Sequence, residues 1–151
     1  MKQLLNGNVR LFGQPPSWQG SYADTLEGRT IVGETALGLQ FAADADGTIA
    51  VLDPEGRSLQ DTGCDLGEFL AAVLEDPDDL VDQKLFEACV ARFGQLTPDR
   101  HFAFIREIVL GGERSADNIE VLDAAEHMAA LASMSRQIAS AKPGTRIRDV
   151  R

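Results

Sequence analysis

The sequence is poor in cysteine and contains no long apolar run. Its 151 residues include only Cys64 and Cys89, too few for a disulfide framework. No apolar stretch approaches the roughly 20 residues that a membrane-spanning helix requires. The N-terminal stretch MKQLLNGNVRLFGQPP has neither the apolar core nor the small-residue cleavage site of a signal peptide. We therefore expect a cytoplasmic protein with reduced thiols and no contact with a membrane.

Positive charge is scarce in the middle of the chain. Residues 44–87 hold 13 Asp and Glu against two basic residues, Arg57 and Lys84, which is a net charge of -11. The other residues hold 11 acids and 12 bases, a net of +1, so this one segment accounts for the total of -10. A negative field repels nucleic acid and attracts basic partners. Direct binding to DNA or RNA is disfavoured, although the excess could also serve solubility alone.

Breaks in regular structure concentrate near the N-terminus. Gly13, the pair Pro15-Pro16 and Gly20 interrupt the first 28 residues, which we expect to form an irregular segment. Trp18 and Tyr22 are expected to anchor it on the domain, the alternative being that they mark a contact surface. Residues 29–151 have a length suited to a single domain. The chain is 44% hydrophobic and 25% charged, as is usual for a soluble globular protein.

A β pattern covers the segment from Arg29 to Thr62. GLQFAAD alternates Leu39, Phe41 and Ala43, and TIAVLD places Ile49 and Val51 on one face. RTIVGET offers two adjacent β-branched residues, and RSLQDT is a weaker, polar strand. The turns DADG and DPEG separate the last three stretches. We predict a three-stranded antiparallel meander preceded by one more strand. Leu39–Ala43 is expected to pair with Thr48–Val51.

Helical spacing begins after the meander. Asp65 and Glu68 have the spacing of a capping box for a helix that Pro77 ends. A second helix is expected from about Asp78 to Gly94. Strands are predicted within HFAFIREIVL and at NIEVL, and a third helix follows Asp123. This order indicates an α+β fold with an antiparallel sheet and about three helices.

The glycine pair Gly111-Gly112 could bind a phosphate or turn a corner. A phosphate loop requires converging N–H groups between a strand and a helix, with a lysine and a hydroxyl residue at fixed spacing. Glu113 follows the pair, and the next segment has the pattern of a strand. A tight corner between two strands is the better interpretation.

The stretch DADGTIAVLDPE, residues 44–55, partly matches a calcium loop. Asp44, Asp46 and Glu55 occupy ligand positions 1, 3 and 12, but Gly47 stands at position 4 instead of 6. The interior alternates like a strand, so a hairpin is preferred. The acidic stretch EDPDDLVD has no neighbouring His or Cys that would favour a dedicated metal site.

Candidate nucleophiles are few. His101 and His127, the only histidines, lie in no known catalytic motif, and a Cys64–His dyad has no positive support. We predict no catalytic residues, no metal and no cofactor.

Several motifs together resemble a known family. EFLAAVLEDP, the following LF, the LGG corner, the DN before a strand and LDAAEHM at a helix start occur in an order similar to the C-terminal domain of bacterial type VI secretion immunity proteins. With the preceding meander, the chain also resembles the broader SUKH immunity superfamily over about residues 36–140. The resemblance implies a SUKH-like single domain with no catalytic motif.

The resemblance implies a non-enzymatic immunity protein that binds and neutralises a cognate toxin, a nuclease in this family. A nuclease has a basic cleft that a dense carboxylate surface could occupy. The candidate toxin-binding residues surround the turn between the first two helices: Glu75, Asp76, Asp78, Asp79 and Asp82. The alternative is a small cytoplasmic ligand-binding domain or an enzyme with an unrecognised pocket.

Overall fold

The computed structural model describes residues 2–141. Its strands are β1 (Lys2–Leu4), β2 (Val9–Leu11), β3 (Thr30–Thr35), β4 (Gln40–Ala43), β5 (Thr48–Asp53), β6 (Ser58–Asp65), β7 (Arg100–Phe104) and β8 (Ile119–Asp123). Its α-helices are α1 (Ala23–Leu26), α2 (Leu66–Glu75), α3 (Pro77–Val81), α4 (Gln83–Phe93) and α5 (Ala124–Ser140). The fold is α+β, as predicted. The first and third expected helices correspond to α2 and α5, the second is divided into α3 and α4, and the described residues add the short α1.

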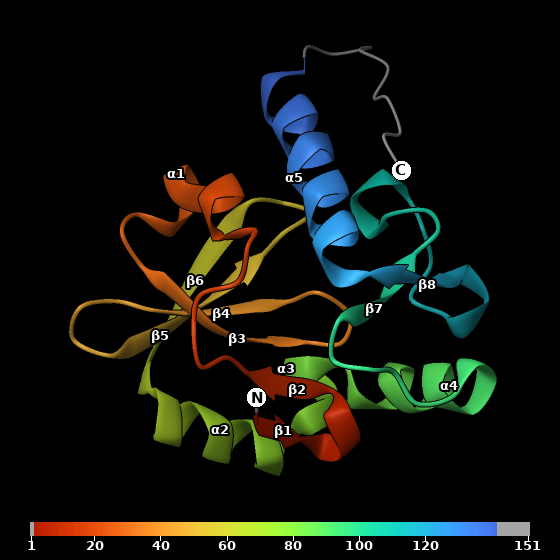
Figure 1. The fold of residues 1–151 in the computed structure, drawn as a ribbon, viewed down its shortest axis with the longest axis horizontal. Helices are drawn as coiled ribbons and strands as arrows, with labels where there is room; N and C mark the ends of the chain where they lie inside the picture. The colour runs from red at the N-terminus through yellow and green to blue at the C-terminus, as the bar shows by residue number, and fades with distance from the viewer. Residues whose placement is uncertain (1, 142–151) are drawn as a thin grey trace.

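An antiparallel sheet in the order β1-β2-β3-β4-β5-β6 forms the centre of the molecule (Figure 1). The predicted meander is confirmed, because β4 pairs with β5 as expected, and the structure sets the register, with Phe41 opposite Val51 and Ala43 opposite Ile49. Adjacent β5 and β6 pair from Thr48 to Asp53 with one irregularity after Ile49.

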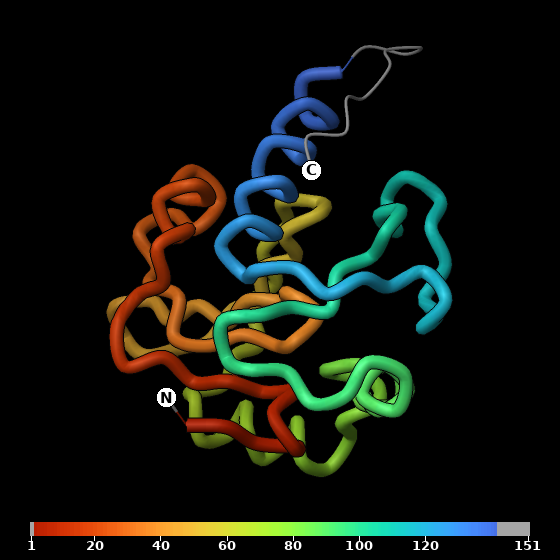
Figure 2. Tube along the Cα trace, turned by 45° about the vertical axis from the view of Figure 1, so that its right-hand side comes forward, coloured from red at the N-terminus to blue at the C-terminus, as the bar shows by residue number. Residues whose placement is uncertain are grey.

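Both faces of this sheet are covered. Phe41 and Ile49 pack against Phe69 and Val73 of α2 on one face. Ala42 and Leu52 of the same strands, together with Ile31, point to the opposite face and pack against α5. Figure 2 shows α2 and α5 on opposite sides of the sheet. Successive residues of a strand point to opposite faces of the sheet. A strand that is covered on both faces therefore has apolar residues at consecutive positions.

The N-terminal segment differs from its prediction. The sequence predicts an irregular segment over residues 1–28, but β1 and β2 form the edge of the six-stranded sheet, where β2 pairs with β3 from Val9 to Leu11. These strands have only three residues each, which is too short for a periodic signal. Trp18 packs partly buried against the core, in agreement with the anchoring role expected of it.

The first helices show one confirmed cap and one unexpected break. Asp65 accepts a hydrogen bond from the Glu68 N–H, and Glu68 reciprocates, so the capping box of α2 is confirmed. The predicted second helix is instead two helices. Asp82 adopts left-handed backbone angles between α3 and α4 (φ 56°). The break allows the buried Gln83 to accept a hydrogen bond from Asn8, a partner 75 residues away.

Strands β7 and β8 form a separate two-stranded ribbon, which packs with α4 around Phe86, Cys89 and Phe102. Gly111 and Gly112 turn the connection between the two strands, as predicted. Gly111 has φ +91°, and a Cβ on Gly112 would lie 1.8 Å from the Arg106 carbonyl oxygen. Asp123 then caps α5 by accepting from the Glu126 N–H. Within residues 2–141, no helix is both long and apolar enough to span a bilayer.

Candidate partner-binding cleft

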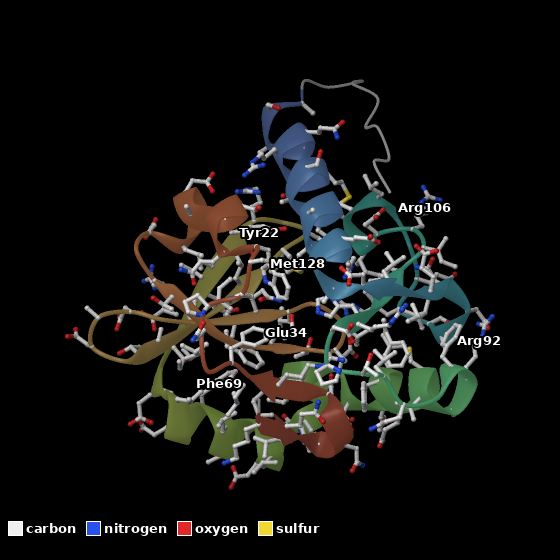
Figure 3. All side chains as sticks on the ribbon, in the orientation of Figure 1. Tyr22, Glu34, Phe69, Arg92, Arg106 and Met128 are labelled. Carbon is white, nitrogen blue, oxygen red and sulfur yellow. The ribbon has the colours of Figure 1, made fainter. Side chains whose placement is uncertain are left out.

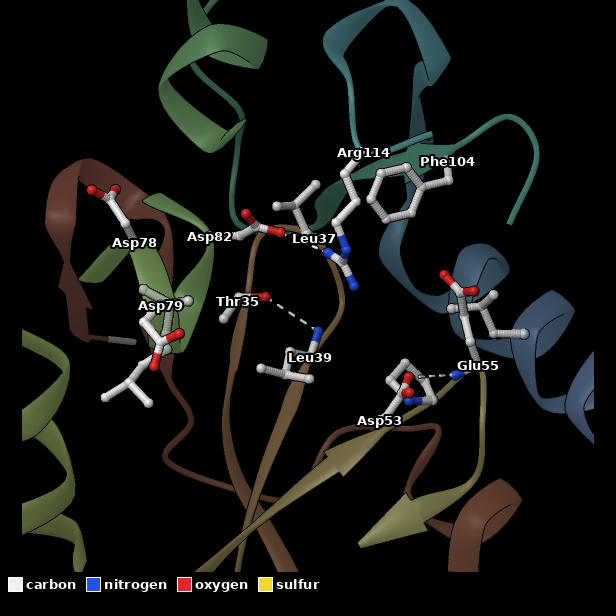
Figure 4. A pocket seen from close by; sticks show the side chains of 14 residues that line it. Thr35, Leu37, Leu39, Asp53, Glu55, Asp78, Asp79, Asp82, Phe104 and Arg114 are labelled. Carbon is white, nitrogen blue, oxygen red and sulfur yellow. Dashed lines mark hydrogen bonds and ion pairs between the residues drawn. The ribbon is translucent and has the colours of Figure 1, made fainter. Parts of the chain in front are cut away.

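A cleft of about 330 Å³ opens where six segments meet (Figure 4). One wall comes from the β3–β4 turn and the β5–β6 turn, and the other from α3, β7, the β7–β8 loop and α5. The lining residues are Thr35, Leu37, Leu39, Asp53, Pro54, Glu55, Asp78, Asp79, Leu80, Val81, Asp82, Phe104, Arg114 and Leu131. The lining therefore combines apolar and charged side chains, a composition common to binding surfaces.

Negative charge dominates the cleft. Its lining holds five carboxylates, on Asp53, Glu55, Asp78, Asp79 and Asp82, against the single guanidinium of Arg114. A concave surface with charges of one sign concentrates the field and attracts oppositely charged partners. The cleft is consequently suited to a basic partner.

Arg114 lies inside this negative field. Its Nη1 atom is 2.6 Å from Asp82 Oδ2, and its guanidinium carbon is 5.8 Å from the centre of the Phe104 ring. Figure 4 shows Arg114 reaching from the β7–β8 loop toward Asp82. The Arg114 side chain is 60% exposed, so the ion pair is screened by water and contributes little to folding.

Glu55 is half-buried and links two of the segments that line the cleft. Burial raises the pKa of its carboxyl above the ordinary value, and the Val109 N–H that donates to it acts in the opposite direction. This hydrogen bond joins the β5–β6 turn to the β7–β8 loop. Asp53 accepts from the Glu55 N–H and thereby shapes the same turn.

The predicted toxin-binding residues divide into two groups. Asp78, Asp79 and Asp82 line the cleft, whereas Glu75 and Asp76 lie outside it at the end of α2. Glu75, Asp76, Asp78 and Asp79 are exposed. Asp78 also accepts from the Lys84 N–H and lies 3.6 Å from the Lys84 ammonium.

Sequence reasoning missed Asp53, Glu55 and Arg114 as members of this site. Asp53 and Glu55 belong to the acidic segment 44–87, so their charge is visible in the sequence, but their turn is distant along the chain from α3. Arg114 is notable in the sequence only as a neighbour of the glycine corner. Compositional bias indicates the right segment, and only the fold brings these residues to one cleft.

A second polar cluster, unsuspected from sequence, is buried beside the cleft. We call it the polar seam: Arg10, Trp18, Glu34, Gln40, His101 and His127. Glu34 accepts hydrogen bonds from Gln40 and Arg10, and Trp18 donates to Gln40. Figure 3 places Glu34 at the centre of the molecule. Arg10, Glu34 and His101 are at most 1% exposed.

The structure does not assemble the considered Cys64–His dyad. Cys64 packs against the apolar cluster beneath α2, whereas the histidines lie on the α5 side of the sheet. Burial raises the pKa of the Cys89 thiol to about 11, which keeps it protonated at neutral pH. No group of three or more metal-binding side chains is assembled within residues 2–141.

Fold and cleft together define an α+β domain with an acidic concave surface. Residues 66–135 match the family described as T6SS immunity protein Tdi1, C-terminal. That segment runs from α2 into α5 and includes Asp78, Asp79, Asp82 and Arg114. The predicted resemblance to type VI secretion immunity proteins is therefore confirmed.

A solved structure supports the fold independently. The chain is similar to the "Crystal structure of Atu4351 from Agrobacterium tumefaciens", with a TM-score of 0.62 and 15% sequence identity. The similarity covers 84% of this chain and 67% of that chain. At this identity it shows a shared fold alone. No curated protein matches this chain.

Proposed function

We propose that the protein is a non-enzymatic immunity protein that binds a cognate type VI secretion toxin in the cytoplasm and neutralises it. The family match supports the class, and the acidic cleft is the observation that carries the mode of binding. The cleft presents five carboxylates and one guanidinium, so its lining has a net charge of about -4 at neutral pH. A basic surface on the toxin is the natural complement.

The same charge argument supports a nuclease as the toxin. A nuclease must hold the phosphates of its substrate and therefore presents basic side chains around its active site. Carboxylates held on a folded surface can occupy that region in place of phosphates. Asp78, Asp79 and Asp82 would make the central contacts, and Glu75 and Asp76 would extend the negative surface along α2. Such complementarity mainly accelerates encounter.

The cleft also favours a second candidate, a ligand-binding domain for a small cationic molecule. Its volume and its apolar residues, including Leu37 and Phe104, resemble those of small-molecule sites. The lining contains no His, Cys or Ser, and the Thr35 hydroxyl already accepts a hydrogen bond from the Leu39 N–H. A binding role therefore fits this cleft better than nucleophilic catalysis.

Co-expression with a candidate toxin from a neighbouring gene tests the proposal. We expect cell survival and co-purification of the two proteins. Asp78→Lys with Asp79→Lys should slow association about tenfold and reduce its dependence on salt. The matched control, Asp46→Lys with Glu87→Lys, makes the same charge change at exposed positions outside the cleft.

Each result separates the candidates. If the toxin kills despite co-expression and does not co-purify, the immunity function is wrong. If the toxin binds but the two double variants associate equally fast, the immunity function stands and the binding surface lies elsewhere. Saturable binding of a small cation without toxin binding would support the second candidate.

A further inference from the structure

The two histidines of the chain meet in its core. His101 on β7 and His127 on α5 approach with their Nδ1 atoms 2.9 Å apart, and their side chains are 0% and 2% exposed. The Nε2 atom of His101 lies 2.8 Å from Glu34 Oε1. Because these are the only two histidines, proton uptake by imidazole anywhere in the protein involves this pair.

The geometry limits how many protons the pair can hold. A hydrogen bond between two Nδ1 atoms requires one nitrogen to carry hydrogen and the other to offer a lone pair. If both rings were imidazolium, both Nδ1 atoms would carry hydrogen and would face each other at 2.9 Å. The closed structure therefore accommodates at most one imidazolium. The unfolded chain has no such restriction.

Charged and polar groups from four further segments surround the pair. Glu34 on β3 already offsets the charge of Arg10 on β2, at 3.4 Å. The guanidinium of Arg10 also donates to the Arg100 and Pro98 carbonyl oxygens, and Asp99 acts on it at longer range. Gln40 on β4 donates to Glu34, and Trp18 places its ring centre 6.1 Å from that of His101. A second positive charge would thus enter a site in which the Glu34 carboxylate already offsets the charge of Arg10.

The histidine pair connects the two parts of the fold that form the cleft. Thr35, Leu37 and Leu39 belong to the six-stranded sheet and its β3–β4 turn, whereas Phe104, Arg114 and Leu131 belong to β7, its following loop and α5. Besides the polar seam, a backbone hydrogen bond from the Phe102 N–H to the Ala36 carbonyl links β7 to the β3–β4 turn. Separation of His101 from Glu34 and His127 would remove a buried connection between the cleft walls and leave the exposed contacts of Val109 with Glu55 and of Arg114 with Asp82.

We propose that the His101–His127 pair is a pH-sensitive contact that keeps the acidic cleft assembled at neutral pH and lets the cleft open on acidification. Unfolded histidines take up protons near pH 6.5. Below that pH the open or unfolded chain binds at least one proton more than the closed structure. The closed state is then disfavoured about tenfold further for each pH unit. Stability is full above about pH 6.5 and falls as the pH decreases. Release of a bound toxin would additionally rest on the proposed function, whereas the opening does not.

Other titrating groups do not produce this loss of stability on acidification. Burial raises the pKa of Glu55, so its protonation favours the folded state as the pH falls, which is the opposite sign. Hydrogen bonds from Arg57 to Asp24 and from Thr97 to Asp99 lower the pKa of both carboxyls. Their contribution is lost only below the ordinary carboxyl range, about pH 4. A window from pH 7.5 to 5.0 isolates the histidines.

The test uses the isolated full chain. The folding equilibrium constant is measured by urea unfolding across the window, with Trp18 as the fluorescent probe, and NMR follows the two imidazoles. We expect about a tenfold loss per pH unit below pH 6. His127→Asn places an amide where Nδ1 stands. Because an amide can donate or accept, it accommodates either state of His101, and the pH slope should vanish.

Two results would overturn the proposal. One is an equal pH slope in wild type and His127→Asn. The other, which requires no variant, is an NMR titration in which both imidazoles become protonated while the wild-type fold persists. If His127→Asn fails to fold, this second measurement still decides. Glu55→Gln serves as a control and should retain the wild-type loss.

Discussion

The acidic cleft and the polar seam are neighbours with opposite relations to water. In the cleft, Asp78 and Asp79 are exposed and Arg114 is 60% exposed, so their charges remain hydrated. In the seam, Arg10 and Glu34 are at most 1% exposed and depend on each other for compensation. An exposed charge contributes little to folding, whereas a buried charge without its partner is strongly destabilising. The charges of the cleft are therefore available to bind a partner, whereas those of the polar seam stabilise the fold.

Removal of a seam charge should have the largest effect. Glu34→Leu leaves Arg10 buried without its carboxylate and removes an acceptor from Gln40 and His101. We expect the free energy of unfolding to fall by about 3–5 kcal/mol at pH 7.5, measured with urea. Arg10→Met combined with Glu34→Leu should recover part of the loss, because no charge is then orphaned. A loss below about 1 kcal/mol in the single variant would contradict the distinction between seam and cleft.

An overpacked corner should have the next largest effect. Gly112 lies in the loop that carries Arg114 into the cleft, and a Cβ there would lie 1.8 Å from the Arg106 oxygen and 2.9 Å from Asn118 Nδ2. Gly112→Ala should destabilise the protein by about 1–3 kcal/mol in thermal unfolding. Gly13→Ala is the control, since a Cβ on Gly13 would meet no atom within 4 Å. Equal stability of the two variants would show that the β7–β8 loop adjusts to a Cβ at position 112 without a cost in stability.

Loss of a helix cap should have a smaller effect. Asp65→Ala removes the acceptor for the Glu68 N–H at the start of α2. We expect a loss of about 1 kcal/mol in urea unfolding, with Asp65→Asn close to wild type because asparagine caps nearly as well. If Asp65→Asn were as destabilising as Asp65→Ala, the negative charge rather than the cap would be responsible.

The exposed cleft acids should affect stability least among these substitutions. Asp78→Lys with Asp79→Lys removes the exposed ion pair with Lys84 and the hydrogen bond that Asp78 accepts from the Lys84 N–H, so the free energy of unfolding should fall by no more than the roughly 1 kcal/mol of one lost cap. The same variant is expected to slow toxin association about tenfold. A large loss of stability without an effect on the association rate would show that these acids stabilise the fold, as the polar seam does, and do not bind the toxin.

A chelator should have no effect at all. The acids of the cleft and of residues 44–55 have neither the spacing nor the His or Cys neighbours of a dedicated metal site. The thermal midpoint should be the same with and without EDTA. A drop of several degrees would identify a bound cation and reassign some of these carboxylates as its ligands.

Local sequence patterns predicted most regular elements. The pairing of β4 with β5 followed from two strand patterns joined by a turn, and the Asp65–Glu68 box followed from spacing within one helical turn. The break at Asp82 was missed because the apolar stripe continues across it. What opposes a continuous helix is the contact of Gln83 with Asn8, a residue on a distant segment.

Charge composition by itself indicated the acidic segment and the kind of partner it would attract, and the motif order indicated the family. Tertiary structure alone decided which acids share a cleft, that Arg114 lies among them and that β1 and β2 complete the sheet. It also decided the pairing of His101 with His127, 26 residues apart, and with Glu34, 67 residues away. Periodicity and capping act between neighbours in the chain, so they are visible in sequence. A buried hydrogen bond between distant segments depends on the packing of the whole core and leaves no local pattern.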